Sequence, residues 1–293
     1  MLFSISTKKD LAKLLGVKPR EIDYTLCRLQ YYYRPKPRMK SDGKVRTLYV
    51  PQGKLKEIQK AIKTEILDKV NWPSTVHGGV RRRSILTNAT VHVGQAVVFA
   101  MDVKDCFPSI GPERILRIFR LIGFDGQAPK ILTHLTTWKF QLPQGAPTST
   151  ALANLALARI DARISSLAKL QGFAYTRYVD DVTVSGGWRL FKFRRLLVRI
   201  VECEGFCVKQ SKVETMHMGQ RQVVTKLVVN CKVNLPREKR DGIRSDLLAA
   251  LSSPAVEITP SMLGRLHWLK YINPSLGQRL IERTKPTDKA DRA

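Results

Sequence analysis

The sequence predicts an α+β fold in which helices pack against one face of an antiparallel sheet. An uncharged apolar run at 97–101 has the length of a buried strand, and residues 174–185 read as a hairpin around a polar turn. Segments with helical spacing of apolar residues flank both. With 293 residues, 43% of them hydrophobic, the chain can bury a substantial core, so we expect two or three subdomains in one continuous architecture.

Residues 1–27 predict a small helical lead-in. Ser6 or Thr7 can cap a helix with Asp10 in its first turn, and the apolar stripe that follows ends at Gly16.

Residues 28–96 predict a hairpin followed by a helix. Val45, Thr47 and Tyr49 alternate as strand residues do, and Asp42-Gly43 suits the turn. Apolar residues at helical spacing come next, namely Leu55, Ile58, Ile62, Ile66 and Val70.

Residues 97–235 predict the sheet and its covering helices, with a helical excursion at about 111–141. Pro112 favours the start of a helix in this excursion, and Gly123 favours its end. Two later helices are predicted by their apolar stripes, Leu152, Leu155, Ile160, Ile164 and Leu167 in one and Phe193, Leu196, Leu197, Ile200 and Val201 in the other.

Residues 236–284 predict a small helical unit, and 285–293 form a polar tail. Thr259-Pro260 is a start signal for the second of two helices here. Their apolar positions are Ile243, Leu247, Leu248 and Leu251, then Leu263, Leu266, Leu269 and Ile272.

The charge of the chain predicts a polyanionic partner. Lys and Arg number 51 against 24 Asp and Glu, which gives a formal net charge of +27. No run of about 18 uncharged apolar residues occurs, and the N-terminus lacks a signal-peptide pattern. We therefore expect a cytoplasmic protein that binds nucleic acid rather than a membrane.

Three carboxylates form the candidate catalytic centre. Asp102 ends the apolar run, and Asp180 and Asp181 lie at the tip of the expected hairpin. An Asp pair in a turn is often only local hydrogen bonding, but a buried acid usually has a partner or a metal. If Asp102 and Asp180 converge, they can hold two Mg²⁺ ions, with Mn²⁺ as a substitute. Paired ions of this kind activate a 3′-hydroxyl and neutralise a leaving pyrophosphate in nucleotidyl transfer. Asp181 is expected on the other side of the turn, in an assisting role.

Three further segments surround these acids. Residues 142–149, with the sequence LPQGAPTS, open a helix; Phe107 follows Asp102 by five residues; and residues 205–208 lead to Lys212. In this order and spacing they resemble the palm motifs of reverse transcriptases. The resemblance runs over nearly the whole chain. It implies a right-hand polymerase with fingers at 28–96, a palm at 97–235 and a small helical thumb at 236–284.

The resemblance also implies roles for single residues around an incoming dNTP. Arg46 would contact the triphosphate, although a hairpin arginine can equally be a solvated charge. Phe107 would be the aromatic gate that excludes a 2′-hydroxyl, the alternative being an ordinary core phenylalanine. Gln144 and Gly145 would support the nucleotide and the template base, with glycine allowing close backbone approach.

Two more roles at the acids are implied by the same resemblance. The backbone carbonyl of Val103 would add a metal ligand. Lys212 would protonate the pyrophosphate; as an isolated lysine it would be a solvated surface charge.

Two segments resemble the retron class of reverse transcriptases in particular. Residues 88–92, with the sequence NATVH, match an Asn-Ala-x-x-His pattern, and residues 224–226 nearly match Val-Thr-Gly. The implied RNA-binding residues are Asn88, His92, Val224, Thr225 and Lys226. Lys226 replaces the usual glycine, and a lysine can reach a phosphate. His92 has no expected catalytic task and by itself reads as a hydrogen-bonded structural histidine.

The retron resemblance implies a specific reaction. Such an enzyme binds a structured noncoding RNA, primes from an internal 2′-hydroxyl and makes short branched single-stranded DNA (msDNA), with an RNA–DNA heteroduplex as intermediate. It implies antiphage defence through a separate effector protein, with host RNase H removing the template. The alternatives are a diversity-generating or intron-derived reverse transcriptase, and a non-catalytic basic RNA-binding protein.

Overall fold

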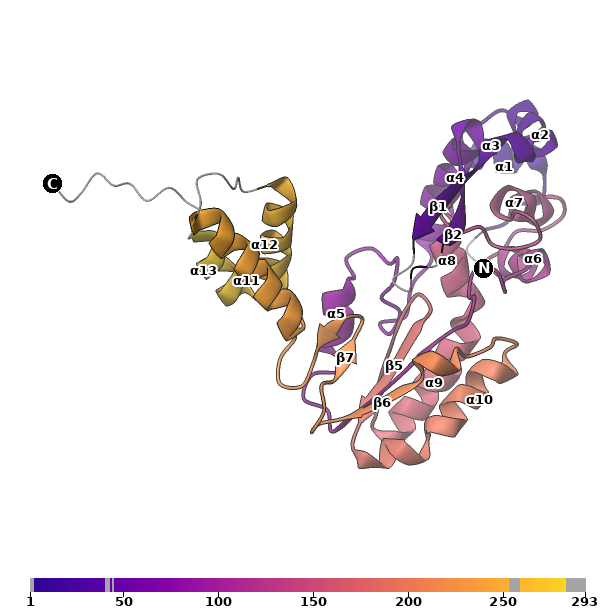
Figure 1. Ribbon diagram of the computed structural model, residues 1–293. Coiled ribbons are helices and arrows are strands. Elements are labelled where there is room, and N and C mark those ends of the chain that lie inside the picture. Colours follow the sequence, from indigo (N-terminus) through magenta and orange to yellow (C-terminus); the bar gives the residue numbers. More distant parts are fainter. Residues whose placement is uncertain (1–2, 40–42, 44, 253–258, 283–293) are drawn as a thin grey trace.

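The computed structural model describes residues 3–39, 43, 45–252 and 259–282. The chain forms an open U, with an N-terminal unit on one side, a sheet at the base and a bundle of C-terminal helices on the other side (Figure 1). The expected α+β class is therefore found, with a four-stranded sheet at its centre.

The N-terminal unit is a helical lead-in followed by a hairpin and a helix. Thr7 caps the first helix as expected, because its side chain accepts a hydrogen bond from the Asp10 amide. The elements are α1 (Lys8–Leu14), α2 (Pro19–Cys27), α3 (Leu29–Tyr32), β1 (Tyr33–Met39), β2 (Val45–Pro51), α4 (Gly53–Glu65) and η1 (Leu67–Lys69). Strands β1 and β2 pair antiparallel, and Asp42 of the expected turn lies outside the described residues. The predicted helix ends earlier than its apolar spacing indicated, at Glu65.

The central sheet has the strand order β4-β5-β3-β6 and is antiparallel throughout. Its strands are β3 (Val97–Asp102), β4 (Ala174–Tyr178), β5 (Asp181–Gly186) and β6 (Glu214–His217). Because side chains alternate along a strand, those of β3 contribute to two hydrophobic cores, one on each face of the sheet. Phe99 and Met101 join the large core under the helices, whereas Val98 and Ala100 belong to a second core on the opposite face.

Helices cover the Phe99 face of the sheet and link it to the N-terminal unit (Figure 1). They are α6 (Pro112–Leu121), α7 (Ala128–Thr136), α8 (Ser149–Ala156), α9 (Ala158–Gln171) and α10 (Arg194–Cys203), with the short η2 (Trp188–Lys192) and η3 (Gln210–Lys212). The single helix expected after residues 142–149 is two helices, divided at Leu157.

The opposite face carries a small hairpin and leads to the C-terminal helices. The elements are α5 (Ile85–Thr90), β7 (Val223–Val224), β8 (Leu227–Val228), α11 (Arg237–Ser252), α12 (Pro260–Ile272) and α13 (Pro274–Glu282). Thr259 caps α12 as expected, and α13 is a third helix that the sequence pattern did not predict. Within the described part of the chain, no helix combines the length and apolarity that a membrane crossing needs.

Candidate active site

Three carboxylates converge at one end of the central sheet. Asp102 and Asp181 are directly opposite each other in the β3–β5 ladder, and residues so paired point to the same face. Asp180 lies in the turn between β4 and β5. Oxygen atoms of all three carboxylates lie within 4.8 Å of one another. The expectation that Asp181 points to the other side of the turn is therefore wrong, because the register of β5 places it beside Asp102.

This cluster is electrostatically strained when it holds no cation. Burial, followed by the charges of Asp180 and Asp102, raises the pKa of Asp181 to about 7. Burial and the charge of Asp102 also raise the pKa of Asp180 above its ordinary value. A bound cation or a proton relieves this repulsion. The cluster consists of carboxylates alone, which is the donor set that hard divalent cations such as Mg²⁺ and Mn²⁺ prefer.

Lys212 supplies a cation at the edge of the cluster. Its Nζ donates to Asp102 Oδ2 at 2.5 Å, and its side chain is about half-exposed. Partial burial works against the charged amine, but the hydrogen bond to Asp102 and the negative charges of the three aspartates together outweigh it and raise the pKa of Lys212. The Lys209 amide donates to the Asp102 carbonyl at 2.9 Å and so fixes η3 against the end of β3. Lys212 is thus held, protonated, at the edge of the acid cluster.

The turn that carries Asp180 rests on a buried arginine. Arg177 is fully buried and makes a bidentate ion pair with Asp161 of α9, with N–O distances of 2.6 and 2.7 Å. Its Nη1 also donates to Asn154 Oδ1 of α8 at 2.8 Å and to the Val179 carbonyl at 2.6 Å. Val179 precedes Asp180 and has a left-handed φ of 59°. Arg177 therefore ties the strained residue of the turn to two helices.

A loop from the N-terminal half packs on the same turn. The His77 amide donates to the Arg177 carbonyl at 2.8 Å, which adds a short parallel bridge beside β4. The next residue, Gly78, touches the turn so closely that a Cβ there would lie 2.4 Å from the Val179 nitrogen. Glycine is required because the backbones meet. Sequence reasoning assigned no role to Arg177 or Gly78.

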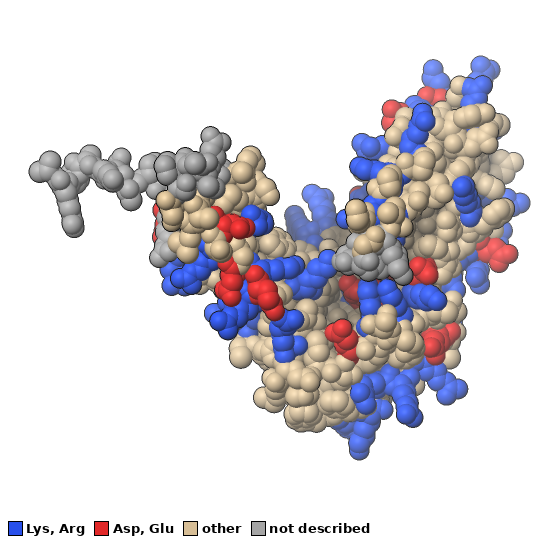
Figure 2. Space-filling view, in the orientation of Figure 1, with Lys and Arg blue, Asp and Glu red and all other residues tan. Residues whose placement is uncertain are grey.

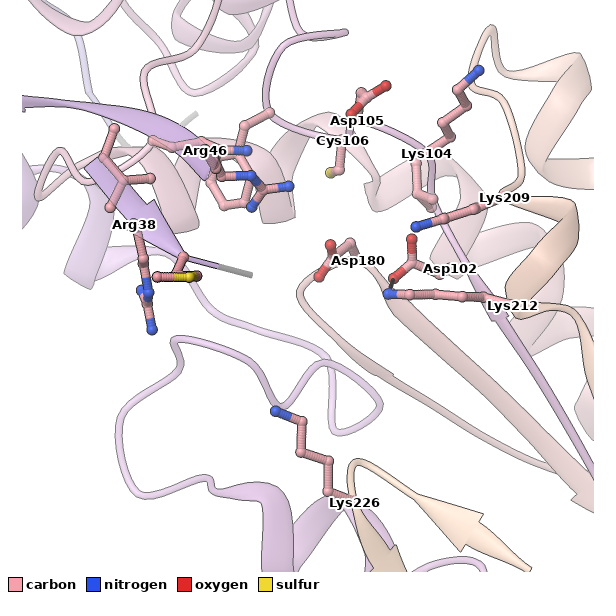
Figure 3. Close-up of a pocket in the computed structure, with 15 residues that line it drawn as sticks. Arg38, Arg46, Asp102, Lys104, Asp105, Cys106, Asp180, Lys209, Lys212 and Lys226 are labelled. Atoms are coloured by element: carbon pink, nitrogen blue, oxygen red, sulfur yellow. Dashed lines mark hydrogen bonds and ion pairs between the residues drawn. The ribbon is translucent and has the colours of Figure 1, made fainter. Parts of the chain in front are cut away.

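Two of the three carboxylates, Asp102 and Asp180, line an open pocket of about 540 Å³ (Figure 3). The expected site residues that line it are Arg46, Asp102, Val103, Phe107, Gln144, Asp180, Lys212 and Lys226. It also contains basic residues that sequence reasoning missed, namely Arg38, Lys104 and Lys209. Arg38 and Arg46 are directly opposite each other in the β1–β2 ladder, and both line the pocket. Arg46 points toward the Asp180 side, whereas Arg38 points toward the side where Lys226 lies (Figure 3). Asp102 and Asp180 thus lie between lysines on one side of the pocket and Arg46 on the other, an arrangement that suits a metal–triphosphate complex.

Phe107 and Gln144 of the 142–149 segment line the same pocket. Phe107 is half-buried and packs against the main core as well. Gly145, the next residue after Gln144, lies just beside the pocket. Gly145 has a φ of 102°, and a Cβ there would lie 3.3 Å from Val50 Cγ2 of β2. This glycine lets the loop pass under the β1–β2 hairpin.

Three of the five expected RNA-binding residues are buried inside the protein. Asn88 and His92 have no exposed surface, and Val224 has 1% exposure. His92 bonds Ser185 and Thr176 through its two ring nitrogens, and burial, with a smaller contribution from His77, lowers its pKa to about 3. The expectation that these three side chains contact RNA directly is therefore wrong.

Asn88 instead supports the β7–β8 hairpin, whereas His92 bonds to β4 and β5. Asn88 Nδ2 lies 3.4 Å from Thr225 Oγ1, and Thr225 Oγ1 donates to the Ile85 carbonyl. Thr225 and Lys226 both have positive φ, 45° and 69°, as a two-residue hairpin turn of type I′ demands. Lys226 is exposed at the tip and reaches into the pocket (Figure 3).

Comparison with known proteins identifies the family of this site. Residues 35–243 match the family model described as reverse transcriptase (RNA-dependent DNA polymerase). The chain belongs to this family. It is 35% identical to the Retron Mx65 reverse transcriptase of Myxococcus xanthus over 96% of this chain and 71% of that one. It is 32% identical to the Retron Ec86 reverse transcriptase of Escherichia coli over 82% of this chain and 76% of that one. The protein is thus a retron-type reverse transcriptase, an RNA-directed DNA polymerase.

A solved structure confirms the polymerase architecture. A telomerase from Candida albicans, in complex with a fragment of telomeric RNA, superposes with a TM-score of 0.51 at 10% identity. The match covers 85% of this chain and 54% of that one. Because the identity is low, the match shows the fold alone.

Proposed function

We propose that this reverse transcriptase copies a structured noncoding RNA into msDNA by two-metal nucleotidyl transfer. The convergence of Asp102, Asp180 and Asp181 beside a pocket lined with basic residues is the observation that carries the chemistry. The retron relatives and the net charge of +27 support the RNA substrate. We assign fingers to 28–96, palm to 97–235 and thumb to 236–284.

The chain's own residues have distinct tasks in this proposal. The three aspartates, with the Val103 carbonyl, would hold two Mg²⁺ ions, for which Mn²⁺ can substitute. Such ions activate the attacking hydroxyl and neutralise charge on the leaving pyrophosphate. Lys212, kept protonated by Asp102, donates a proton to the pyrophosphate.

Other residues around the pocket position the incoming dNTP. Arg38 and Arg46 bind the triphosphate, since both extend from the hairpin into the pocket. Phe107 blocks a 2′-hydroxyl, and Gln144 with Gly145 supports the nucleotide. Thr225 and Lys226, at the tip of β7–β8, lie where they can contact the nucleic acid backbone.

The retron relatives support the wider biological role. The enzyme would prime from an internal 2′-hydroxyl of its RNA and leave a branched RNA–DNA product. A host RNase H would remove copied template, and a separate effector protein would act in antiphage defence.

The test is to isolate small nucleic acids from cells that carry the native locus with wild-type or Asp180→Asn protein. We expect DNA joined to RNA with wild type only, because the amide removes charge needed for metal binding and little volume. Asp246→Asn makes the same change at a half-exposed aspartate paired with Arg265, far along the chain from the cluster, and should leave the product intact. Absence of branched DNA, with Mg²⁺-dependent primer extension present, would contradict the retron role. Absence of primer extension would favour a non-catalytic RNA-binding protein.

The gate assignment is tested separately. Phe107→Ala should admit rNTPs in primer extension, because the ring beneath the sugar is removed. Unchanged discrimination between dNTPs and rNTPs would contradict it.

A further inference from the structure

A second groove opens on the other side of the central sheet from the carboxylates. It has a volume of about 660 Å³, and its lining includes Phe99, Phe191, Lys192, Arg195, Gln210 and Thr215. Phe99 points away from the Asp102 face because the two residues are an odd number apart on β3. The short helix η3 separates the two sites, with Gln210 lining the groove and Lys212 bonded to Asp102. The groove is therefore distinct from the catalytic pocket.

Uncompensated positive charge runs along this groove. Lys192 and Arg195 line the groove, and Arg199 follows Arg195 by four residues on the same face of α10. All three are exposed, none forms an ion pair with another described residue, and no acidic side chain lines the groove. The arginines of neighbouring α9 differ, because Arg159 and Arg163 both pair with Glu204. Figure 2 shows Lys and Arg side chains gathered over this part of the palm.

A fixed aromatic platform lies at the end of this charged face. Trp188 is 56% exposed although it is a large apolar side chain. Its ring stacks on Phe191 with a centroid separation of 5.9 Å and an interplanar angle of 8°. The Arg194 guanidinium lies 4.9 Å from the centroid of the Phe191 ring. An exposed ring held in place beside a row of cations is the arrangement on which nucleic acid bases stack.

We propose that this groove binds a folded part of the RNA that is not being copied. Lys192, Arg195 and Arg199 contact its phosphates, and Trp188 stacks on an unpaired base. RNA fits better than an acidic protein because an exposed, stacked indole adds a base-binding element to the positive charge. The inference rests on the proposed function, since it requires an RNA whose template segment occupies the catalytic pocket. The groove would hold the rest of that molecule near the enzyme while the template moves through the pocket.

The experiment measures RNA binding while the catalytic pocket is filled. The enzyme is first trapped on a short RNA–DNA primer–template with a dideoxy-terminated primer and the next dNTP. A labelled stem-loop RNA with an unpaired flank is then titrated at several salt concentrations. We expect Lys192→Glu/Arg195→Glu/Arg199→Glu to weaken binding at least tenfold and to reduce the slope of log K against log [salt] by about 2 to 3, for three lost phosphate contacts. Trp188→Ala should weaken binding about 5- to 150-fold.

The matched control is Lys13→Glu/Lys60→Glu/Arg120→Glu, which makes the same charge change at exposed residues of α1, α4 and α6, none of which lines the groove. It should change stem-loop affinity less than threefold. Thermal unfolding checks folding, and if charge reversal prevents folding, the three glutamine substitutions take its place. Equal effects of the groove and control variants would overturn the proposal, as would equal binding of a DNA stem-loop of the same sequence. Primer extension on the short template should persist in every variant. If the wild-type enzyme itself shows no primer extension, the result counts against the proposed function and not against the groove.

Discussion

Arg177 offers the sharpest test of how the fold positions the catalytic turn. Arg177→Met leaves the Asp161 carboxylate buried with only the Tyr175 hydroxyl as a donor at Oδ1. Removing one partner of a buried ion pair costs about 3–5 kcal/mol, because the remaining charge is uncompensated. The Val179 carbonyl also loses its donor, so the turn before Asp180 is no longer tied to α8 and α9. We expect unfolding free energy and polymerisation rate to fall together in this variant.

A second variant separates these two effects. Arg177→Met/Asp161→Leu/Tyr175→Phe replaces the buried polar groups by apolar ones of similar size, a change that is often neutral for stability. We expect it to regain at least half of the lost unfolding free energy. The turn still lacks the charge-assisted hydrogen bond to Val179, worth about 1.5–3 kcal/mol, so kcat should remain about 10- to 150-fold low.

The assay pairs urea unfolding, followed by circular dichroism, with primer extension at saturating dNTP. A triple variant that regains stability and kcat together would show that the network only supports the core. A loss below about 1 kcal/mol in Arg177→Met would refute the claim that this ion pair is buried and tightly coupled.

Three further predictions concern the turn, the hairpin tip and the acid cluster. Gly78→Ala should lower kcat strongly in primer extension, since its Cβ would collide with Val179, whereas Gly187→Ala meets no atom within 4 Å and should not. Lys226→Gly should raise the unfolding free energy in urea by about 1 kcal/mol, because glycine tolerates the left-handed turn, and should reduce the salt slope of heteroduplex binding by about one. Without divalent metal, unfolding free energy should fall as pH rises from about 4 through about 7, since the raised pKa of Asp181 favours the protonated folded state. Asp181→Asn should flatten that profile, and a profile unchanged by it would contradict the raised pKa.

The elements predicted best from the sequence are those whose structure is determined by residues close together in the chain. The caps at Thr7 and Thr259 and the hairpin at 174–185 follow from spacing and turn chemistry within a few residues. Asp102 could be identified as a candidate site residue from local sequence too, because a charged residue directly after a buried strand is unusual. The division at Leu157 and the end of α4 at Glu65 were not predicted, since apolar spacing continues through both points.

The residues that sequence misjudged depend on partners far along the chain. Arg177 was given no role, because its partners Asp161 and Asn154 lie 16 and 23 residues away along the chain. The motif around His92 suggests RNA contact, but the other reading of this residue, a hydrogen-bonded structural histidine, is confirmed: its partners Ser185 and Thr176, 93 and 84 residues distant, enclose it. A shared motif therefore does not say whether a residue contacts the ligand or supports one that does. In the 224–226 segment that distinction is set by the turn, since the left-handed pair at its tip is what exposes Lys226 while Val224 stays buried.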